Sequence, residues 1–300
     1  MASAKPDFAL PPQTVLHARY LLGDTLGGGA LGITYRAVQL DAPARGRVVA
    51  VKEFFPRALA VRAADGSVQP RPKGAADFAL YCARFVRGYR FLHAMADFPP
   101  LVPLLDLFEQ NGTAYVVMAY IEGETLAQRV KAHGAIPPRA LMRMMRPFLD
   151  DLAALHRRQI IHRAIMPRNI LLRGENPPML LDFGGARPED DWPLRRCPVL
   201  RGRGYLPPEQ ICQSRQGSWT DVYALCATMY YALTAKEPAD ALERLFAAKT
   251  GKDDPLVSIR TLCPKLPRKQ ADALMAGLSL DSAARPADFA ALESALYGSK

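Results

Sequence analysis

The sequence predicts an α+β fold in which a small antiparallel β-sheet with one helix precedes a larger, mainly helical part. Two observations carry this prediction. Strand-like segments rich in β-branched and aromatic residues dominate the first third of the chain, whereas helical periodicity dominates after Glu122-Gly123. The 300 residues, 49% of them apolar, suit one or two packed lobes. We expect a loose lead-in over residues 1–14, a first lobe over 15–120 and a second over 121–298.

The first lobe is expected to contain five strands and one helix. Asn111-Gly112 separates the last two strands and is a strong hairpin-turn signal. The helix is predicted over residues 77–96, where the aromatic residues Tyr81, Phe85 and Tyr89 recur at helical spacing. The expected strands are residues 20–22, 33–38, 48–55, 101–108 and 113–120.

The second lobe is predicted to be a series of helices with two short strand-like pieces at 170–172 and 179–181. Pro138 and Pro286 stand near predicted helix starts, where proline is tolerated because its missing N–H has no helical partner. The expected helices are residues 125–133, 138–158, 220–235, 239–250, 268–278 and 286–297.

Composition excludes several classes of protein. The net charge of +10 can indicate nucleic acid, but no nucleic-acid-binding motif and no run of basic residues accompanies it, so we expect no nucleic-acid partner. No apolar run is long enough to predict a membrane segment in this chain, and the first residues do not resemble a secretory signal. The odd count of five cysteines, without a CxxC pair, favours free thiols in a reducing compartment. We therefore expect a cytoplasmic location.

A glycine-rich loop is the first motif with chemical content. Gly27, Gly29 and Gly32 form G-x-G-x-x-G, which alone is a weak signal. A dinucleotide-binding unit would require a helix after the loop, but Ile33-Thr34-Tyr35 predicts a strand. Twenty residues after Gly32, Lys52 ends the sequence Val-Ala-Val-Lys. A glycine loop between two strands, followed by this lysine, indicates a loop that binds phosphate groups but does not belong to a dinucleotide-binding unit.

Later segments complete an ordered series. His162-Arg163-Ala164 opens a segment that ends at Asn169, and Asp182-Phe183-Gly184 follows thirteen residues after that asparagine. Together with the glycine loop and Lys52, these segments resemble bacterial serine/threonine protein kinases, a resemblance that covers residues 18–297. Segments 32–35, 52–56 and 63–66 resemble one bacterial branch. The remaining motif positions are Pro207-Pro208-Glu209, Asp221 and Arg285.

The resemblance implies a two-lobed kinase fold that binds ATP and Mg²⁺. The glycine loop would cover the phosphates, and Lys52 would reach the α- and β-phosphates. Asn169 and Asp182 would hold Mg²⁺. Arg285 would pair with Glu209, and Asp221 would be buried. The cofactor-binding set implied by the family is Leu26, Gly27, Gly29, Gly32, Ala50, Lys52, Met118, Tyr120 and Leu171.

Four departures from the family pattern concern one chemistry. Ala164 replaces the aspartate that orients the substrate hydroxyl and accepts its proton. Met166 replaces the lysine that stabilises the transferred phosphoryl group. Gly88 stands at the position of the helix glutamate that pairs with the lysine, and no acidic residue occurs from 78 to 96. Gly202 stands near the position of the activation-loop threonine. Tyr205 is the only hydroxyl side chain between Asp182 and Glu209.

These departures favour an ATP-binding pseudokinase that acts as a regulatory or scaffolding module. Three alternatives remain open. The chain could be an active serine/threonine kinase of low rate, since phosphoryl transfer rests largely on positioning and electrostatics. It could catalyse nucleotidyl transfer on the same fold. Lys52 and Asp182 could also persist only as a structural ion pair, without nucleotide.

Two sets of arginines suggest a protein partner that is acidic or phosphorylated, because arginine matches carboxylate and phosphate bidentately. One set, Arg84, Arg87 and Arg90, recurs every three residues on the predicted first helix. The second set is Arg187, Arg195, Arg196, Arg201 and Arg203. A simpler interpretation is that both sets are only solvent-exposed faces without a partner.

Overall fold

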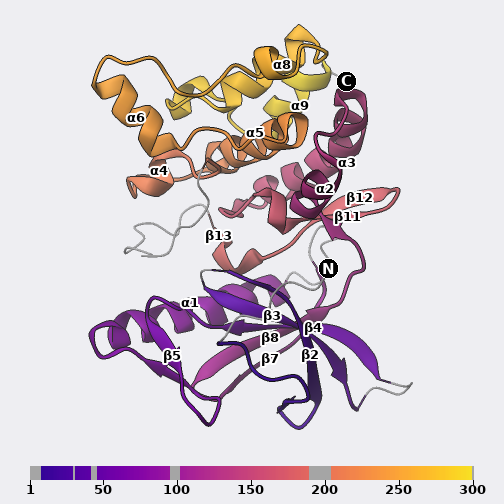
Figure 1. Ribbon diagram of the computed structural model, residues 1–300, viewed down its shortest axis with the longest axis vertical. Coiled ribbons are helices and arrows are strands. Elements are labelled where there is room, and N and C mark those ends of the chain that lie inside the picture. The colour runs from indigo at the N-terminus through magenta and orange to yellow at the C-terminus, as the bar shows by residue number, and fades with distance from the viewer. Residues whose placement is uncertain (1–7, 30, 42–45, 95–101, 189–203, 299–300) are drawn as a thin grey trace. The chain divides into compact units, whose positions relative to one another are not determined.

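The computed structural model describes residues 8–29, 31–41, 46–94, 102–188 and 204–298. The chain divides into two compact units, Met1–Ile121 and Glu122–Lys300 (Figure 1), called here the N-terminal and C-terminal units. The first holds the large sheet and one long helix, and the second is mainly helical. The predicted fold class is therefore confirmed.

The N-terminal unit is built on a six-stranded antiparallel sheet of order β1-β2-β3-β4-β8-β7. A separate hairpin, β5 (Ala60–Arg62) with β6 (Val68–Pro70), turns at Gly66, whose φ is +84°. The sheet strands are β1 (Val15–Leu16), β2 (Tyr20–Gly28), β3 (Gly32–Gln39), β4 (Arg47–Phe54), β7 (Leu104–Gln110) and β8 (Thr113–Ala119).

The hairpin between β7 and β8 forms at the predicted turn. Asn111 and Gly112 have φ values of 54° and 71°, and Gln110 pairs with Thr113 across the turn. Both central residues therefore have the positive φ that a tight two-residue hairpin requires. A side chain at Gly112 would also lie 2.6 Å from the carbonyl oxygen of Val68, so no other residue fits there.

Helix α1 (Ala75–His93) packs on the sheet through aromatic rings. The ring of Phe54 on β4 lies 5.4 Å from that of Phe78 and 5.3 Å from that of Phe85. The predicted apolar face at Tyr81, Phe85 and Tyr89 is buried, as expected from its helical spacing.

The C-terminal unit is organised around α5 (Ser218–Thr234), whose residues are buried on nearly every side. Figure 1 shows α5 running below α8 and α9. Two small sheets accompany the helices: β10 (Ile160–Ile161) with β13 (Arg187–Pro188), and β9 (Glu124–Thr125) with β11 (Ile170–Arg173) and β12 (Asn176–Leu180). The other helices are α2 (Leu126–His133), α3 (Pro138–Arg157), α4 (Pro208–Ile211), α6 (Ala241–Lys249), α7 (Ile259–Leu262), α8 (Arg268–Gly277) and α9 (Phe289–Tyr297).

Several boundaries differ from those predicted. The last helix begins at Phe289 rather than 286, because the Asp288 side chain caps it by accepting a hydrogen bond from Ala291 N. The strand predicted from 101 begins at Leu104, and α1 ends at His93 rather than at 96. The β5–β6 hairpin was not predicted as strands. Among the described residues, no helix is both long and apolar enough to span a membrane.

Candidate nucleotide-binding and catalytic site

The glycine loop connects β2 and β3, as its sequence predicted. Gly27 pairs with Thr34 across the two strands, and the Gly29 N–H donates to the carbonyl of Gly32 at 2.8 Å. A side chain at Gly32 would lie 2.2 Å from the carbonyl oxygen of Glu53, so strand packing requires glycine there. A side chain at Gly27 would meet no atom within 4 Å. Packing within the chain therefore does not explain Gly27, whereas close approach of a ligand would.

One face of the sheet gathers the predicted nucleotide residues of this unit. Ala50 and Lys52 alternate along β4 and point to the same face, and Ala50 pairs with Met118 on β8. Lys52 pairs with Thr34 on β3, the residue opposite Gly27. The backbone register thus brings the loop, Lys52, Ala50 and Met118 onto one face of the sheet, on which Lys52 and Ala50 are buried.

Tyr120 and Leu26 are close in sequence to this set, two residues after Met118 and one residue before Gly27. The guanidinium Cζ of Arg36 lies 5.6 Å from the centroid of the Tyr120 ring, within the range of a cation–π contact. Leu26 on β2 is 42% exposed. An exposed leucine beside a glycine loop is available to contact an apolar ring of a ligand.

The opposite face of β4 carries a buried ionic cluster that was not predicted from the sequence. Glu53 is fully buried, and each of its carboxylate oxygens accepts from Arg62 at 2.6 Å. The Tyr115 hydroxyl donates to Oε1 at 2.9 Å and the Tyr35 hydroxyl to Oε2 at 2.8 Å. Burial, reinforced by the Glu53 charge, raises the pKa of both tyrosines, so both stay protonated donors. All four residues will be called the Glu53 cluster.

The N-terminal segment joins this cluster. The Leu10 N–H donates to the Tyr35 hydroxyl at 3.0 Å, and Arg62 Nε donates to the Phe8 carbonyl at 3.0 Å. The Phe8 ring stacks on that of Phe55 at 5.6 Å. Residues at the start of the described chain thus pack against β4 on the face opposite Lys52.

The candidate catalytic loop lies in the C-terminal unit and is held by Asp221. This carboxylate, 1% exposed on α5, accepts from the backbone N–H groups of His162 at 2.6 Å and Arg163 at 2.7 Å. His156 Nε2 lies 3.2 Å from the same carboxylate. Although burial alone raises the pKa of Asp221, hydrogen bonds and charge from the two histidines lower it. Asp221 is therefore ionised when it holds the loop backbone.

Asn169 closes the loop. Its side-chain Nδ2 donates to the Ala164 carbonyl at 2.8 Å, which leaves Oδ1 as the amide's acceptor. The Leu181 N–H donates to the Asn169 carbonyl at 2.7 Å, which brings the residue before Asp182 against Asn169. Asp182 has a φ of 61°, and its Oδ1 accepts from Gly184 N at 3.3 Å. The structure thus brings together the two residues predicted to hold Mg²⁺.

These two residues do not form a closed metal site. The described part of the chain contains no group of three or more His, Cys, Asp or Glu residues that could hold a metal ion. One amide oxygen and one carboxylate suit Mg²⁺, which prefers oxygen ligands and takes the rest of its shell from water and phosphates. The donor set therefore fits an ion that arrives with a nucleotide.

Two of the departures from the family pattern, Ala164 and Met166, lie in the segment that ends at Asn169. Ala164 lies two residues after His162, whose ring packs edge-on against Phe183 with the ring centroids 4.6 Å apart. An added side chain at Gly185 would lie 3.9 Å from the Ala164 methyl group. Met166 is buried, with neither charge nor donor to offer a phosphoryl group.

The remaining predicted residues fall in different settings. Gly88 lies on the buried face of α1, whose sequence has no acidic residue after Asp77. Leu171 is buried on β11, where it pairs with Thr125 and Met179. Gly202 lies outside the described residues.

The expected pairing of Glu209 with Arg285 is confirmed. Arg285 Nη1 and Nη2 donate to the two carboxylate oxygens at 2.8 and 3.1 Å, and Thr220 Oγ1 donates to Oε1 at 2.9 Å. Tyr205, three residues before the start of α4, is buried, and burial raises the pKa of its hydroxyl. Among the described residues, burial of Tyr205 and the hydrogen bonds of Glu209 therefore hold the two ends of segment 205–209.

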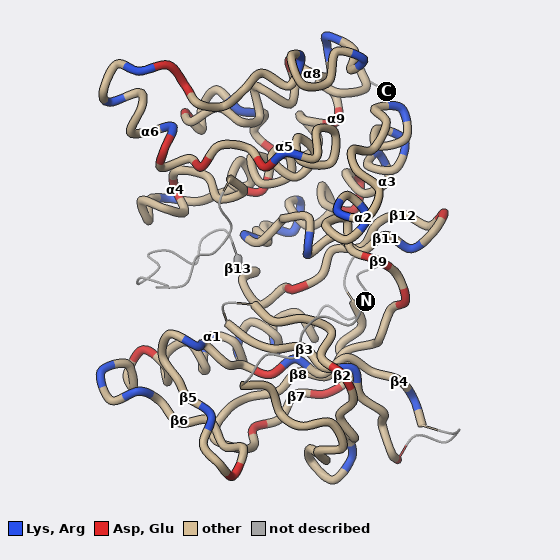
Figure 2. Tube along the Cα trace, in the orientation of Figure 1, with Lys and Arg blue, Asp and Glu red and all other residues tan. Residues whose placement is uncertain are grey.

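The arginine sets are only partly described. Arg87 and Arg90 are exposed on α1, whereas Arg84 is half-buried with its Cζ 5.9 Å from the Tyr81 ring centroid. Lys and Arg are spread over both units in Figure 2. In the second set, Arg195, Arg196, Arg201 and Arg203 lie outside the described residues, as does the side chain of Arg187.

Fold and site define a protein-kinase-like domain. Residues 20–275 match the protein kinase domain family. Because this match covers most of the chain, the chain belongs to the protein kinase family. Members of that family generally bind ATP with Mg²⁺ and act on proteins.

Curated relatives of this chain include bacterial serine/threonine-protein kinases. Serine/threonine-protein kinase PknA of Nostoc sp. is 30% identical over 236 residues, which cover 76% of this chain and 39% of that protein. Probable serine/threonine-protein kinase pknA2 of Bifidobacterium longum is 27% identical over 282 residues, 93% of this chain and 35% of that protein. The chain thus spans little more than a third of the length of these relatives.

Solved structures show the same fold. The apo form of PpkA-294 matches with a TM-score of 0.78 at 25% identity, over 97% of this chain and 100% of that one. A Rad53 fragment in complex with AMP-PNP matches with a TM-score of 0.67 at 21% identity, over 93% of this chain and 65% of that one.

Proposed function

We propose that this chain is an ATP-binding pseudokinase domain with little or no phosphotransfer, which acts as a regulatory or scaffolding module. The observation that carries the proposal is the state of the catalytic loop. Asp221 and Asn169 hold its backbone through hydrogen bonds of 2.6 to 2.8 Å, while the side chain at the centre of the loop is the methyl group of Ala164. The hydrogen bonds that hold the loop are present, whereas the carboxylate that would accept the substrate's proton is absent.

Nucleotide binding is supported residue by residue. Glycine at 27 leaves open space that packing does not require, and Lys52 shares a sheet face with Ala50 and Met118. Lys52 would bind phosphate as a point charge on a long stem. Asn169 and Asp182 would supply oxygen ligands to Mg²⁺, whose bound form would neutralise phosphate charge.

Low activity follows from the chemistry of the replaced residues. General-base catalysis is typically worth about 10²–10⁴ in rate, or roughly 3–5 kcal/mol of barrier. Met166 removes a further donor, and the sequence of α1 offers no carboxylate near Gly88 to pair with Lys52. Three supports of one reaction are thus absent together.

The proposal is tested by nucleotide binding with and without Mg²⁺. Thermal or urea unfolding should show stabilisation by ATP of about 2.7 kcal/mol at a hundred times Kd. Lys52→Met should remove most of this gain, whereas Lys73→Met, an exposed lysine of the same unit, should retain it. Asp182→Asn should remove the added effect of Mg²⁺ but leave binding of the free nucleotide. No stabilisation by any nucleotide would leave Lys52 and Asp182 with a purely structural role.

Transfer assays distinguish a pseudokinase from a slow kinase and from a nucleotidyl transferase. With γ-labelled ATP and Mg²⁺ or Mn²⁺, we expect transfer no faster than that of the Asp182→Ala variant. Robust γ-label transfer that Asp182→Ala abolishes would contradict the pseudokinase proposal and establish a slow kinase. Transfer of an α-label would instead indicate nucleotidyl transfer.

A protein partner and a cytoplasmic location belong to the same proposal. The exposed residues Arg87 and Arg90 suit an acidic or phosphorylated partner. The four cysteines in the described part of the chain are all free thiols, as a reducing compartment would keep them. We propose no nucleic-acid partner.

A further inference from the structure

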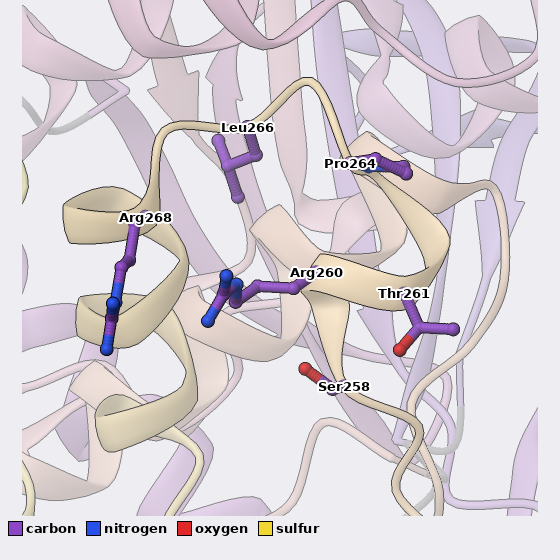
Figure 3. Close-up of a pocket in the computed structure, with 6 residues that line it drawn as sticks. All are labelled: Ser258, Arg260, Thr261, Pro264, Leu266 and Arg268. Atoms are coloured by element: carbon purple, nitrogen blue, oxygen red, sulfur yellow. The ribbon is translucent and has the colours of Figure 1, made fainter.

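A polar hollow lies on the C-terminal unit between α7 and α8, and no part of the candidate nucleotide site belongs to it. Its volume is about 550 Å³. Figure 3 shows two guanidinium groups at one side of it, with the Arg260 side chain reaching toward Arg268 and the Ser258 hydroxyl below them. The lining residues are Ser258, Arg260, Thr261, Pro264, Leu266 and Arg268.

The two arginines are held only weakly by the protein. The Arg260 side chain makes no hydrogen bond or ion pair with any of the described residues. Arg268 Nε lies 3.5 Å from an Asp272 carboxylate oxygen one turn along α8, but their side chains are 79% and 58% exposed. An exposed pair of this kind contributes little, so it would not prevent Arg268 from binding another anion.

The described residues that line the hollow include two cations and no carboxylate. Like charges that face one hollow repel each other unless an anion lies between them. Guanidinium groups bind phosphate through paired N–H donors, and the hydroxyls of Ser258 and Thr261 add further donors. Pro264 and Leu266 offer apolar surface on the remaining wall. This combination fits a group with a charged head and a carbon stem.

We propose that this hollow binds a phosphomonoester carried by a protein segment, that is, a phosphoserine or phosphothreonine of a partner. A water molecule takes about 30 Å³ of liquid volume, so the hollow has room for the residue that carries the phosphate as well as the phosphate itself. The inference goes beyond the proposed function, because it holds whether or not nucleotide binds.

The test uses the full chain and a library of short peptides with central phosphoserine or phosphothreonine and degenerate flanks. We expect enrichment over the matched unphosphorylated library. The enriched peptide should bind with an affinity that falls as salt rises. Arg260→Gln and Arg268→Gln should each weaken binding at least about tenfold. Ser258→Ala, which leaves the charge unchanged, should weaken binding to a smaller extent.

Lys269→Gln is the matched control, since it removes one charge from an exposed lysine on the same helix outside the hollow. It should leave the affinity within about twofold. Thermal melts should show that every variant folds, as expected for exposed side chains. No enrichment of phosphorylated peptides, or unchanged binding by Arg260→Gln, would overturn the site. Inorganic phosphate that binds as tightly as the enriched peptide would overturn the assignment to a protein segment.

Discussion

The side-chain amide of Asn169 donates a hydrogen bond of 2.8 Å to the backbone carbonyl of Ala164. This contact holds the loop without any help from the side chain at position 164. The loop backbone is therefore held whichever side chain stands at position 164, and placing an acidic group there is a direct test of the proposed function.

Ala164→Asp combined with Met166→Lys should raise γ-phosphoryl transfer to a generic protein substrate. The gain should be about 10²–10⁴ over the parent chain, because a general base and a phosphoryl donor return together. The measurement is single-turnover transfer from γ-labelled ATP.

One further variant and an ATP-binding measurement on the double variant interpret that experiment. The double variant with Asp182→Ala should return to background, since it would lack the metal-binding carboxylate. If the double variant itself stays at background while it binds ATP, the absent glutamate at Gly88 limits the chain more than the absent base does.

Glycines 27 and 32 should respond differently to alanine. Gly32→Ala places a methyl group 2.2 Å from the Glu53 carbonyl oxygen, so the free energy of unfolding should fall by about 1–3 kcal/mol. Gly27→Ala has open space and should leave stability nearly unchanged while reducing stabilisation by ATP. Urea unfolding with and without nucleotide measures both effects. Equal loss of stability in the two variants would show that both glycines are structural.

Glu53→Gln should destabilise the chain by about 3–5 kcal/mol, because it leaves the largely buried Arg62 guanidinium without its counter-charge. Glu109→Gln, at an exposed position on β7 of the same sheet, is the control and should change stability by less than about 0.5 kcal/mol. Chemical denaturation followed by circular dichroism measures the difference. A small effect of Glu53→Gln would mean that the cluster adds little net stability.

The acid sensitivity of the chain should depend in part on Asp221. Its pKa is lowered in the folded state, so it stabilises the fold above its unfolded pKa of about 3.9. That contribution is lost as pH falls through the lower folded value. Asp221→Asn should therefore be less stable than the parent at pH 7, with a gap that narrows below about pH 4. Denaturation midpoints at several pH values give the gap, and a constant gap would contradict this assignment.

Local chemistry made much of the fold predictable. Asn111-Gly112 specifies its own turn, because few residue pairs accept two positive φ values. The aromatic spacing of α1 specifies its buried face. The ends of elements were less predictable, since the start of α9 depends on which side chain caps it, and Asp288 rather than Pro286 sets that point.

The hairpin of β5 and β6 could not be predicted from the sequence. Residues 63–66 form its turn, in which Asp65 Oδ1 accepts a hydrogen bond from Ser67 N at 2.9 Å. Three-residue strands contain too little periodicity to be predicted from sequence.

The amino-acid sequence alone specifies which reacting groups this protein has and lacks: Lys52, Asn169 and Asp182 are present, and Ala164 and Met166 replace two others. The presence or absence of a side-chain group is part of the covalent structure, so the sequence is enough to show it. Folding, in contrast, turns Glu53, one residue from Lys52, to the opposite face of β4, where it meets Arg62, Tyr35 and Tyr115. Folding also places the guanidinium of Arg260 toward that of Arg268. The sequence alone does not specify these contacts, because a charged side chain pairs with groups that are close in space, and these are not its neighbours along the chain.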